Sequence, residues 1–139
     1  MLFKRKIYDK FLAWKTECAG KKALLVEGAR RIGKSTVVEE FAKNEYKSYI
    51  LIDFAKASSD VKEYFQLYLN DLDTFFMLLS VQYGVQLHER DSVIIFDEVQ
   101  LFPKAREAIK YLVADGRYDY METGSLISIK ENVKDIVIP

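Results

Sequence analysis

The sequence has very few residues of three types: one cysteine, two prolines and one histidine in 139 residues. The single cysteine, Cys18, excludes an internal disulfide and has no partner residues for a metal site, so a reducing cytoplasm is the compartment we expect. The sequence also has no apolar run of about 18 residues, the length that spans a membrane. Because of this absence we expect no membrane partner, and because the first ten residues are highly charged we expect no secretory signal peptide.

An excess of one charge is missing as well, because 21 basic residues balance 21 acidic ones. This balance removes the usual electrostatic argument for nucleic acid as the main partner. Hydrophobic residues make up 50% of the chain and aromatic residues 14%, which predicts a globular protein rather than a disordered one. A length of 139 residues corresponds to one domain or to part of one.

Residues 1–20 predict an N-terminal amphipathic helix. Ile7, Phe11 and Trp14 are spaced as the apolar side of a helix that packs on the domain. Basic residues outnumber acidic ones in this part of the chain. We expect the basic side to be a solvated helix surface, and the alternative is a contact with the adenine side of a nucleotide or with a partner protein.

The central motif is the phosphate-loop pattern G-x-x-x-x-G-K-S, which runs from Gly28 to Ser35. It follows a short apolar run, residues 23–26, of the kind that forms a buried parallel strand. It precedes residues 37–42, in which apolar side chains recur at helical spacing. The alternative is a chance match, and the flanking strand and helix argue against it because the motif requires both.

The chemistry of a nucleoside triphosphate explains the residues of this loop. Gly28 and Gly33 let backbone N–H groups converge on the phosphates, and the following helix adds the positive end of its dipole. Lys34 would bring a positive charge to the β- and γ-phosphates and so take part in catalysis, while the Ser35 hydroxyl would ligate Mg²⁺. The expected phosphate-binding residues are Gly28, Ala29, Arg30, Arg31, Ile32, Gly33, Lys34, Ser35 and Thr36.

A second motif lies at residues 92–98, where four consecutive apolar residues precede Asp97 and Glu98. This pattern predicts a central parallel strand that delivers two carboxylates to its C-terminal end. Asp97 would hold Mg²⁺, directly or through water, and Glu98 would activate the water that attacks the γ-phosphate. The alternative is an ordinary strand that ends in two solvated acids.

Two further strands are predicted, at residues 48–53 and 118–123. Asp53, at the end of the first, either lies near the nucleotide or caps the loop that follows. The other strand ends at Thr123, and Ser125 follows closely. One of these two hydroxyls would sense the γ-phosphate, and the alternative is an ordinary Gly-Ser turn.

Apolar side chains at helical spacing predict two helices between residues 61 and 83 and a third from Pro103 to Asp115. The first two carry many aromatic residues, which we expect to pack in the core; a partner-binding surface is the alternative. His88 precedes a strand, at the end away from the expected site, so we do not expect it to be catalytic.

Both motifs, together with residues 123–125, resemble the AAA+-like P-loop ATPases of the "AAA domain, type 14" group of bacteria and archaea. The resemblance covers nearly the whole chain, and its most particular features are the paired Arg30 and Arg31 and the D-E-V-Q form of residues 97–100. It implies an α/β fold, a P-loop NTPase three-layer αβα sandwich with a parallel sheet of strand order 1-4-3-2, and ATP with Mg²⁺. Members of the group continue into a fifth strand, a helical lid and a C-terminal domain. We expect these parts to be missing from residues 1–139, which would be a truncated core.

Two classes of function follow. The first is an Mg²⁺-dependent ATPase whose cycle drives a conformational change in the missing C-terminal region. The second is a nucleotide-dependent switch or an inactive fragment with negligible hydrolysis, since no arginine finger can be assigned and such a residue is worth about 10³–10⁵ in rate. A small-molecule kinase or GTPase is a weaker third class, because no guanine-reading N-K-x-D segment occurs. The expected partners are the nucleotide, the C-terminal domain in cis, and a protein partner or a second copy of the chain.

Overall fold

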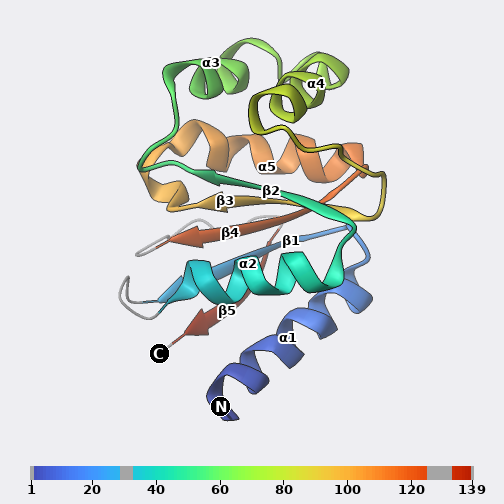
Figure 1. Ribbon diagram of the computed structural model, residues 1–139, viewed down its shortest axis with the longest axis vertical. Helices are drawn as coiled ribbons and strands as arrows, with labels where there is room; N and C mark the ends of the chain where they lie inside the picture. Colours follow the sequence, from blue (N-terminus) through green and yellow to red (C-terminus); the bar gives the residue numbers. More distant parts are fainter. Residues whose placement is uncertain (1, 29–32, 125–132, 139) are drawn as a thin grey trace.

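The computed structural model describes residues 2–28, 33–124 and 133–138 and has a five-stranded parallel sheet at its centre (Figure 1). The strands are β1 (Ala23–Gly28), β2 (Ser48–Asp53), β3 (Ser92–Asp97), β4 (Asp119–Gly124) and β5 (Val133–Ile138). They lie in the order β2-β3-β4-β1-β5, and every neighbouring pair is parallel. All five C-terminal strand ends therefore meet at one edge of the sheet, where ligands bind in open α/β folds.

Helices cover both faces of this sheet and make it the middle layer of an αβα sandwich (Figure 1). They are α1 (Leu2–Cys18), α2 (Lys34–Glu45), α3 (Ser59–Leu67), α4 (Leu72–Tyr83) and α5 (Pro103–Asp115), with a short 3₁₀ turn, η2 (Val99–Leu101), after β3. One buried cluster joins α1 and α2 to the sheet, and a second joins α3, α4 and α5 to the opposite face. The predicted three-layer α/β fold and the strand order 1-4-3-2 are confirmed.

Strand β3 shows how the sequence produces these layers. All of its residues are buried. Ile94 and Phe96 belong to the cluster on the α5 side, whereas Val93 and Ile95 belong to the cluster on the α2 side. Side chains alternate between the two faces of a strand, so a strand that lies between two helical layers is apolar along its middle, here from Val93 to Phe96.

The aromatic residues of α3 and α4 lie mainly in the core. Phe65 and Phe75 are fully buried, and their ring centroids are 5.0 Å apart in an edge-to-face arrangement. Phe65 makes a similar contact of 5.5 Å with Phe96 of β3. Such pairs contribute about 0.5–1.5 kcal/mol each beyond the burial of their area. They hold α3 and α4 against the sheet, as expected for core packing.

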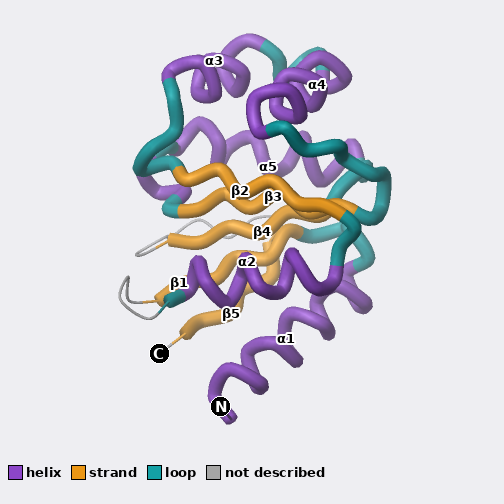
Figure 2. Tube along the Cα trace, viewed as in Figure 1, coloured by secondary structure: helices purple, strands orange, loops and turns teal. Residues whose placement is uncertain are grey.

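The predicted absence of a fifth strand is wrong. Residues 133–138 form β5, which pairs with β1 in parallel register from Ala23 opposite Val133 to Gly28 opposite Ile138 (Figure 2). The β1 strand is therefore an interior strand with β4 on its other side. The segment was missed because its sequence, VKDIVI, has neither a regular alternation nor an unbroken apolar run.

Helix α1 lies against α2 near the N-terminus of the chain (Figure 2). It buries Ile7, Phe11 and Trp14, the three residues that the helical spacing placed on its apolar side. The indole N–H of Trp14 donates a hydrogen bond of 2.9 Å to the carbonyl oxygen of Lys22, which ties the helix to the turn before β1. Among the described helices, none combines the length and the apolar character that crossing a bilayer requires.

Candidate functional site

The phosphate-loop motif joins the C-terminal end of β1 to the N-terminus of α2. Gly33 immediately precedes α2 with φ at 70°, a left-handed conformation that favours glycine. Lys34 is the first residue of the helix, and Ser35 and Thr36 follow in its first turn. The predicted phosphate-binding residues Ala29, Arg30, Arg31 and Ile32 lie outside the described residues, and so does the side chain of Lys34.

Ser35 and Asp97 are in direct contact at this edge of the sheet. The Ser35 hydroxyl donates a hydrogen bond of 2.6 Å to Oδ1 of Asp97, although the two residues are 62 positions apart in the sequence. A hydroxyl has one hydrogen to donate and two lone pairs. Ser35 Oγ therefore retains lone pairs for a metal ion while it donates to Asp97. The two residues predicted to be metal ligands lie side by side.

Thr123, in β4, contacts the same carboxylate. Its buried hydroxyl donates a hydrogen bond of 2.5 Å to Oδ1 of Asp97 and accepts one of 3.0 Å from the backbone N–H of Glu98. The neighbouring strands β3 and β4 bring these groups together at their C-terminal ends. The other predicted sensor, Ser125, lies outside the described residues.

Glu98 has an unusual backbone conformation. It follows β3 with φ at 55° and ψ at 47°, the left-handed region that non-glycine residues seldom adopt. Its half-buried carboxylate accepts a long hydrogen bond, 3.4 Å, from the side-chain amide of Gln100 in η2. Sequence reasoning identified Glu98 but gave no role to Gln100, whose place in the D-E-V-Q pattern was the available signal.

The electrostatics of the cluster centre on Asp97. This residue is only 7% exposed, and both hydroxyls donate to Oδ1. No side chain that the structure describes donates a hydrogen bond to Oδ2 or forms an ion pair with Asp97. A buried carboxylate is normally stabilised by a cation or by further donors.

The donor set of this cluster is suited to Mg²⁺. A serine hydroxyl and a carboxylate oxygen are hard oxygen ligands, which Mg²⁺ prefers. Within residues 2–28, 33–124 and 133–138, no group of three or more His, Cys, Asp or Glu side chains could hold a metal ion alone. Mg²⁺ commonly binds through one or two protein ligands, with water and phosphate oxygens supplying the rest.

Asp53 behaves as a loop cap. It pairs in register with Asp97 across the β2–β3 boundary. Its Oδ1, however, accepts a hydrogen bond of 2.9 Å from the backbone N–H of Ala55, two residues further on. Of the two sequence-based interpretations, the structure favours capping of the loop after β2.

The opposite edge of the sheet holds a second carboxylate cluster, which sequence reasoning missed. Asp119, at the start of β4, accepts a hydrogen bond from Arg90 on Oδ1 and one from the Tyr46 hydroxyl on Oδ2, both 2.5 Å long. Burial, followed by the neighbouring Asp119, raises the pKa of Tyr46 far above its ordinary value. No sequence pattern indicated this cluster, because Arg90 and Tyr46 are 29 and 73 positions from Asp119.

A second buried ion pair lies beside Thr123. Glu122 is fully buried, and its Oε2 is 3.4 Å from Nη1 of Arg106 in the first part of α5. This contact connects α5 to β4 on the face opposite α2. It was also missed, since the docking of α5 on the sheet cannot be deduced from spacing along the chain.

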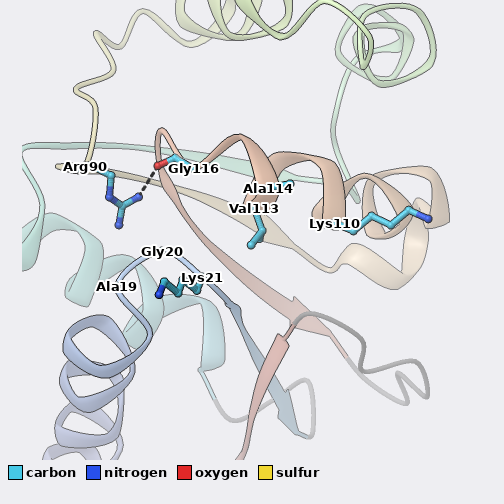
Figure 3. A pocket seen from close by; sticks show the side chains of 8 residues that line it. All are labelled: Ala19, Gly20, Lys21, Arg90, Lys110, Val113, Ala114 and Gly116. Atoms are coloured by element: carbon cyan, nitrogen blue, oxygen red, sulfur yellow. Dashed lines mark hydrogen bonds between the residues drawn. The ribbon is translucent and has the colours of Figure 1, made fainter.

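A hollow of about 490 Å³ lies at the N-terminal edge of the sheet, where Arg90 and Gly20 face each other (Figure 3). Arg90 donates a hydrogen bond of 3.0 Å to the carbonyl oxygen of Gly116, whereas the side chain of Lys110 points away from Arg90. The basic residues around this hollow therefore do not converge on one point. His88 precedes β3 at this edge and donates its backbone N–H to Ser92, which is in keeping with a structural role.

Comparisons with known proteins point to a nucleotide-binding domain. The model of a family described as "AAA domain" matches residues 20–136. Comparison with curated proteins gives no match. Among solved structures, PCH-2 of C. elegans is similar in fold, with a TM-score of 0.52 and 13% sequence identity over 98% of this chain. The chain spans 42% of the length of PCH-2.

Proposed function

This chain belongs to the AAA domain family, and from that premise we propose that it binds ATP with Mg²⁺ and hydrolyses ATP to ADP and phosphate. The observation that carries the proposal is the hydrogen bond of 2.6 Å between Ser35 of the phosphate-loop motif and Asp97 at the end of β3. It joins the two motifs that ATP hydrolysis requires, one for the phosphates and one for the metal ion and water.

The phosphate-binding half of the mechanism uses the start of α2. Backbone N–H groups of the loop and of the first helical turn, with the positive end of the helix dipole, would hold the β- and γ-phosphates. Lys34, the first residue of α2, would add a positive charge to them. Positioning and neutralisation of charge supply most of the rate enhancement in reactions of this class.

The metal-binding half uses Ser35 and Asp97. Ser35 Oγ would coordinate Mg²⁺ through a lone pair while its hydroxyl continues to donate a hydrogen bond to Asp97. Asp97 would hold a metal-bound water. When bound, Mg²⁺ neutralises charge on the β- and γ-phosphates. The second acid, Glu98, would accept a proton from the attacking water as the bond between the γ-phosphorus and the ADP oxygen breaks. Thr123 or Ser125 would sense the γ-phosphate.

The proposal extends to a nucleotide-driven conformational change in a C-terminal region that follows this domain in longer chains of the family. A cytoplasmic location and a protein partner or second copy belong to the same proposal. Support for the location comes from the single cysteine, and support for the partner comes from the resemblance alone.

Calorimetric titration with ATP and Mg²⁺ tests nucleotide binding. We expect Lys34→Ala to abolish binding, because the lysine charge meets the phosphates directly. Lys43→Ala, at the other end of the same helix, is the matched control and should bind as the wild type does. Substitution of Arg30 or Arg31 should weaken binding less than Lys34→Ala. Unchanged ATP affinity in Lys34→Ala would count against the site.

Phosphate release tests hydrolysis. Glu98→Gln should retain ATP binding and lose phosphate release, because the amide cannot take the proton from water. If the wild type binds ATP but releases no phosphate above background, the chain is a nucleotide-dependent switch rather than an ATPase.

A further inference from the structure

Thr123 lies between the two acids of the site. Its hydroxyl is fully buried at the C-terminal end of β4, donates to Oδ1 of Asp97 at 2.5 Å and accepts the N–H of Glu98 at 3.0 Å. One side chain thus contacts the carboxylate proposed to hold the metal-bound water and the backbone of the residue proposed to activate the attacking water.

A hydroxyl has one hydrogen, which limits the hydrogen bonds that Thr123 can donate. That hydrogen is donated to the Asp97 carboxylate. Hydrogen bonds from a hydroxyl to a carboxylate are about twice as strong as those between neutral groups. To donate to a phosphate oxygen, Thr123 would have to break this short bond inside the protein. The lone pairs of its oxygen would repel a phosphate rather than attract it.

Glu98 needs support from its surroundings. A left-handed conformation is unfavourable for a residue with a side chain, and it persists where neighbouring groups hold it in place. Glu98 has φ at 55° and ψ at 47°, and its N–H is fixed by Thr123. On its other side, the Glu98 carbonyl accepts the N–H of Leu101 at 3.0 Å in the turn of η2. The direction of the Glu98 side chain depends on this backbone conformation.

We infer that Thr123 is a positioning residue, not a phosphate sensor: its hydroxyl locks the carboxylate of Asp97 and the left-handed backbone of Glu98 into one arrangement. This inference rests on the proposed function, since it assigns to Thr123 a role in the hydrolysis carried out at Asp97 and Glu98. It also separates Thr123 from Ser125, which the sequence alone did not.

The test compares Thr123→Val with Thr123→Ser in the full chain. Valine keeps the shape of threonine without the hydroxyl, whereas serine keeps the hydroxyl. Amide hydrogen exchange, read by NMR, reports on the Glu98 N–H without any nucleotide. We expect this amide to exchange at least tenfold faster in Thr123→Val and near the wild-type rate in Thr123→Ser. Amides within β3 and β4 serve as the control for folding. Thr123→Ala repeats the comparison if the valine variant does not fold.

Kinetics and binding complete the test. Phosphate release at saturating ATP should fall at least tenfold in Thr123→Val, with KM and the ratio of ATP to ADP affinity within about threefold of the wild type, and serine should restore the rate.

Unchanged exchange of the Glu98 amide in Thr123→Val overturns the inference whatever the rate does. A lower ratio of ATP to ADP affinity with unchanged exchange identifies a phosphate sensor instead. Failure of the wild type to bind ATP would refute the proposed function, while the exchange measurement would still decide whether Thr123 holds Glu98.

Discussion

Two buried aspartates, Asp97 and Asp119, lie at opposite edges of the same sheet and differ in their partners. Asp119 is 4% exposed, and it accepts a hydrogen bond from an arginine on one oxygen and from a tyrosine hydroxyl on the other. Asp97 is 7% exposed, and one of its oxygens accepts hydrogen bonds from two hydroxyls. Both carboxylates are hydrogen-bonded, but of the two only Asp119 forms an ion pair with a side chain that the structure describes.

The proposed function assigns different roles to the two carboxylates: Asp119 is structural and Asp97 is available for binding. At Asp119, a guanidinium from the protein compensates the charge, and both oxygens are occupied, so the cluster stabilises the fold. At Asp97, hydroxyls fix the orientation of the carboxylate without neutralising it. A cation such as Mg²⁺, brought by ATP, would complete that cluster. Hence the same amide substitution should have opposite consequences at the two positions.

The largest effect is expected for Asp97→Asn. The amide keeps the size of the side chain and an oxygen that accepts from Ser35 and Thr123, but it removes the negative charge. Phosphate release should fall by about 10²–10³, the loss seen when one preorganised electrostatic group is removed. The free energy of unfolding, measured in urea, should change by less than about 1 kcal/mol. A large loss of stability with normal activity would contradict the comparison.

Asp119→Asn should show the reverse. The amide cannot neutralise the charge of Arg90. Its N–H₂ group, itself a donor, would also face either the guanidinium of Arg90 or the hydroxyl of Tyr46, both of which donate to Asp119. We expect a loss of about 1–3 kcal/mol in the free energy of unfolding, the cost of leaving a buried hydrogen-bonding group without its partner. Since Arg90 is 43% exposed, the value should lie below that of a fully buried ion pair. ATP affinity should not change. Weaker ATP binding without loss of stability would show that the N-terminal edge takes part in function.

The sequence predicted one of these clusters and missed the other, for a physical reason. Ser35 and Asp97 each belong to a recognisable motif, and parallel strands bring their C-terminal ends to one edge, so their contact could be expected. Asp119, Arg90 and Tyr46 belong to no motif. Their contact depends on the register of β4 and on the packing of α2, and neither can be deduced from local patterns.

The same limits apply to the fold and to the details of the site. Strands with continuous apolar runs, such as β3, were predicted because their burial on both faces dictates their composition. Lys134 and Asp135 interrupt the apolar residues of strand β5, so its pattern did not identify it as a strand. The left-handed conformation of Glu98 leaves no mark on the sequence, because glutamate has no preference for it. For that reason the contact of Thr123 with the Glu98 backbone became apparent only from the structure.

Alkaline pH tests the Asp119 cluster through the hydroxyl of Tyr46. The raised pKa keeps Tyr46 protonated in the folded protein, whereas in the unfolded chain it ionises near its ordinary value of about 10. The stability from this group is therefore complete below about pH 10 and is lost by about 1.4 kcal/mol per pH unit above it. Between pH 9 and 11, Tyr46→Phe should lose less stability than the wild type does. Equal losses, measured by urea unfolding, would contradict the coupling of Tyr46 to Asp119.

The smallest effect is expected for Ser35→Thr. Threonine supplies the same hydroxyl, and the phosphate-loop motif accepts either residue. ATP affinity and phosphate release should stay within about threefold of the wild type. Ser35→Ala, which removes the hydroxyl, is the matched comparison and should lose the dependence of binding on Mg²⁺. Equal behaviour of the threonine and alanine variants would show that the hydroxyl does not serve the metal ion.

The dependence of ATP binding on Mg²⁺ decides whether Asp97 serves the metal ion. Calorimetric titrations with ATP, in Mg²⁺ and in EDTA, should show binding by the wild type at least tenfold tighter with the metal ion. Asp97→Asn should lose this difference, and Asp119→Asn should retain it. Wild-type binding that is absent or insensitive to Mg²⁺ would contradict the assignment of Asp97 as the carboxylate that serves the metal ion. A full Mg²⁺ effect in Asp97→Asn would contradict it as well.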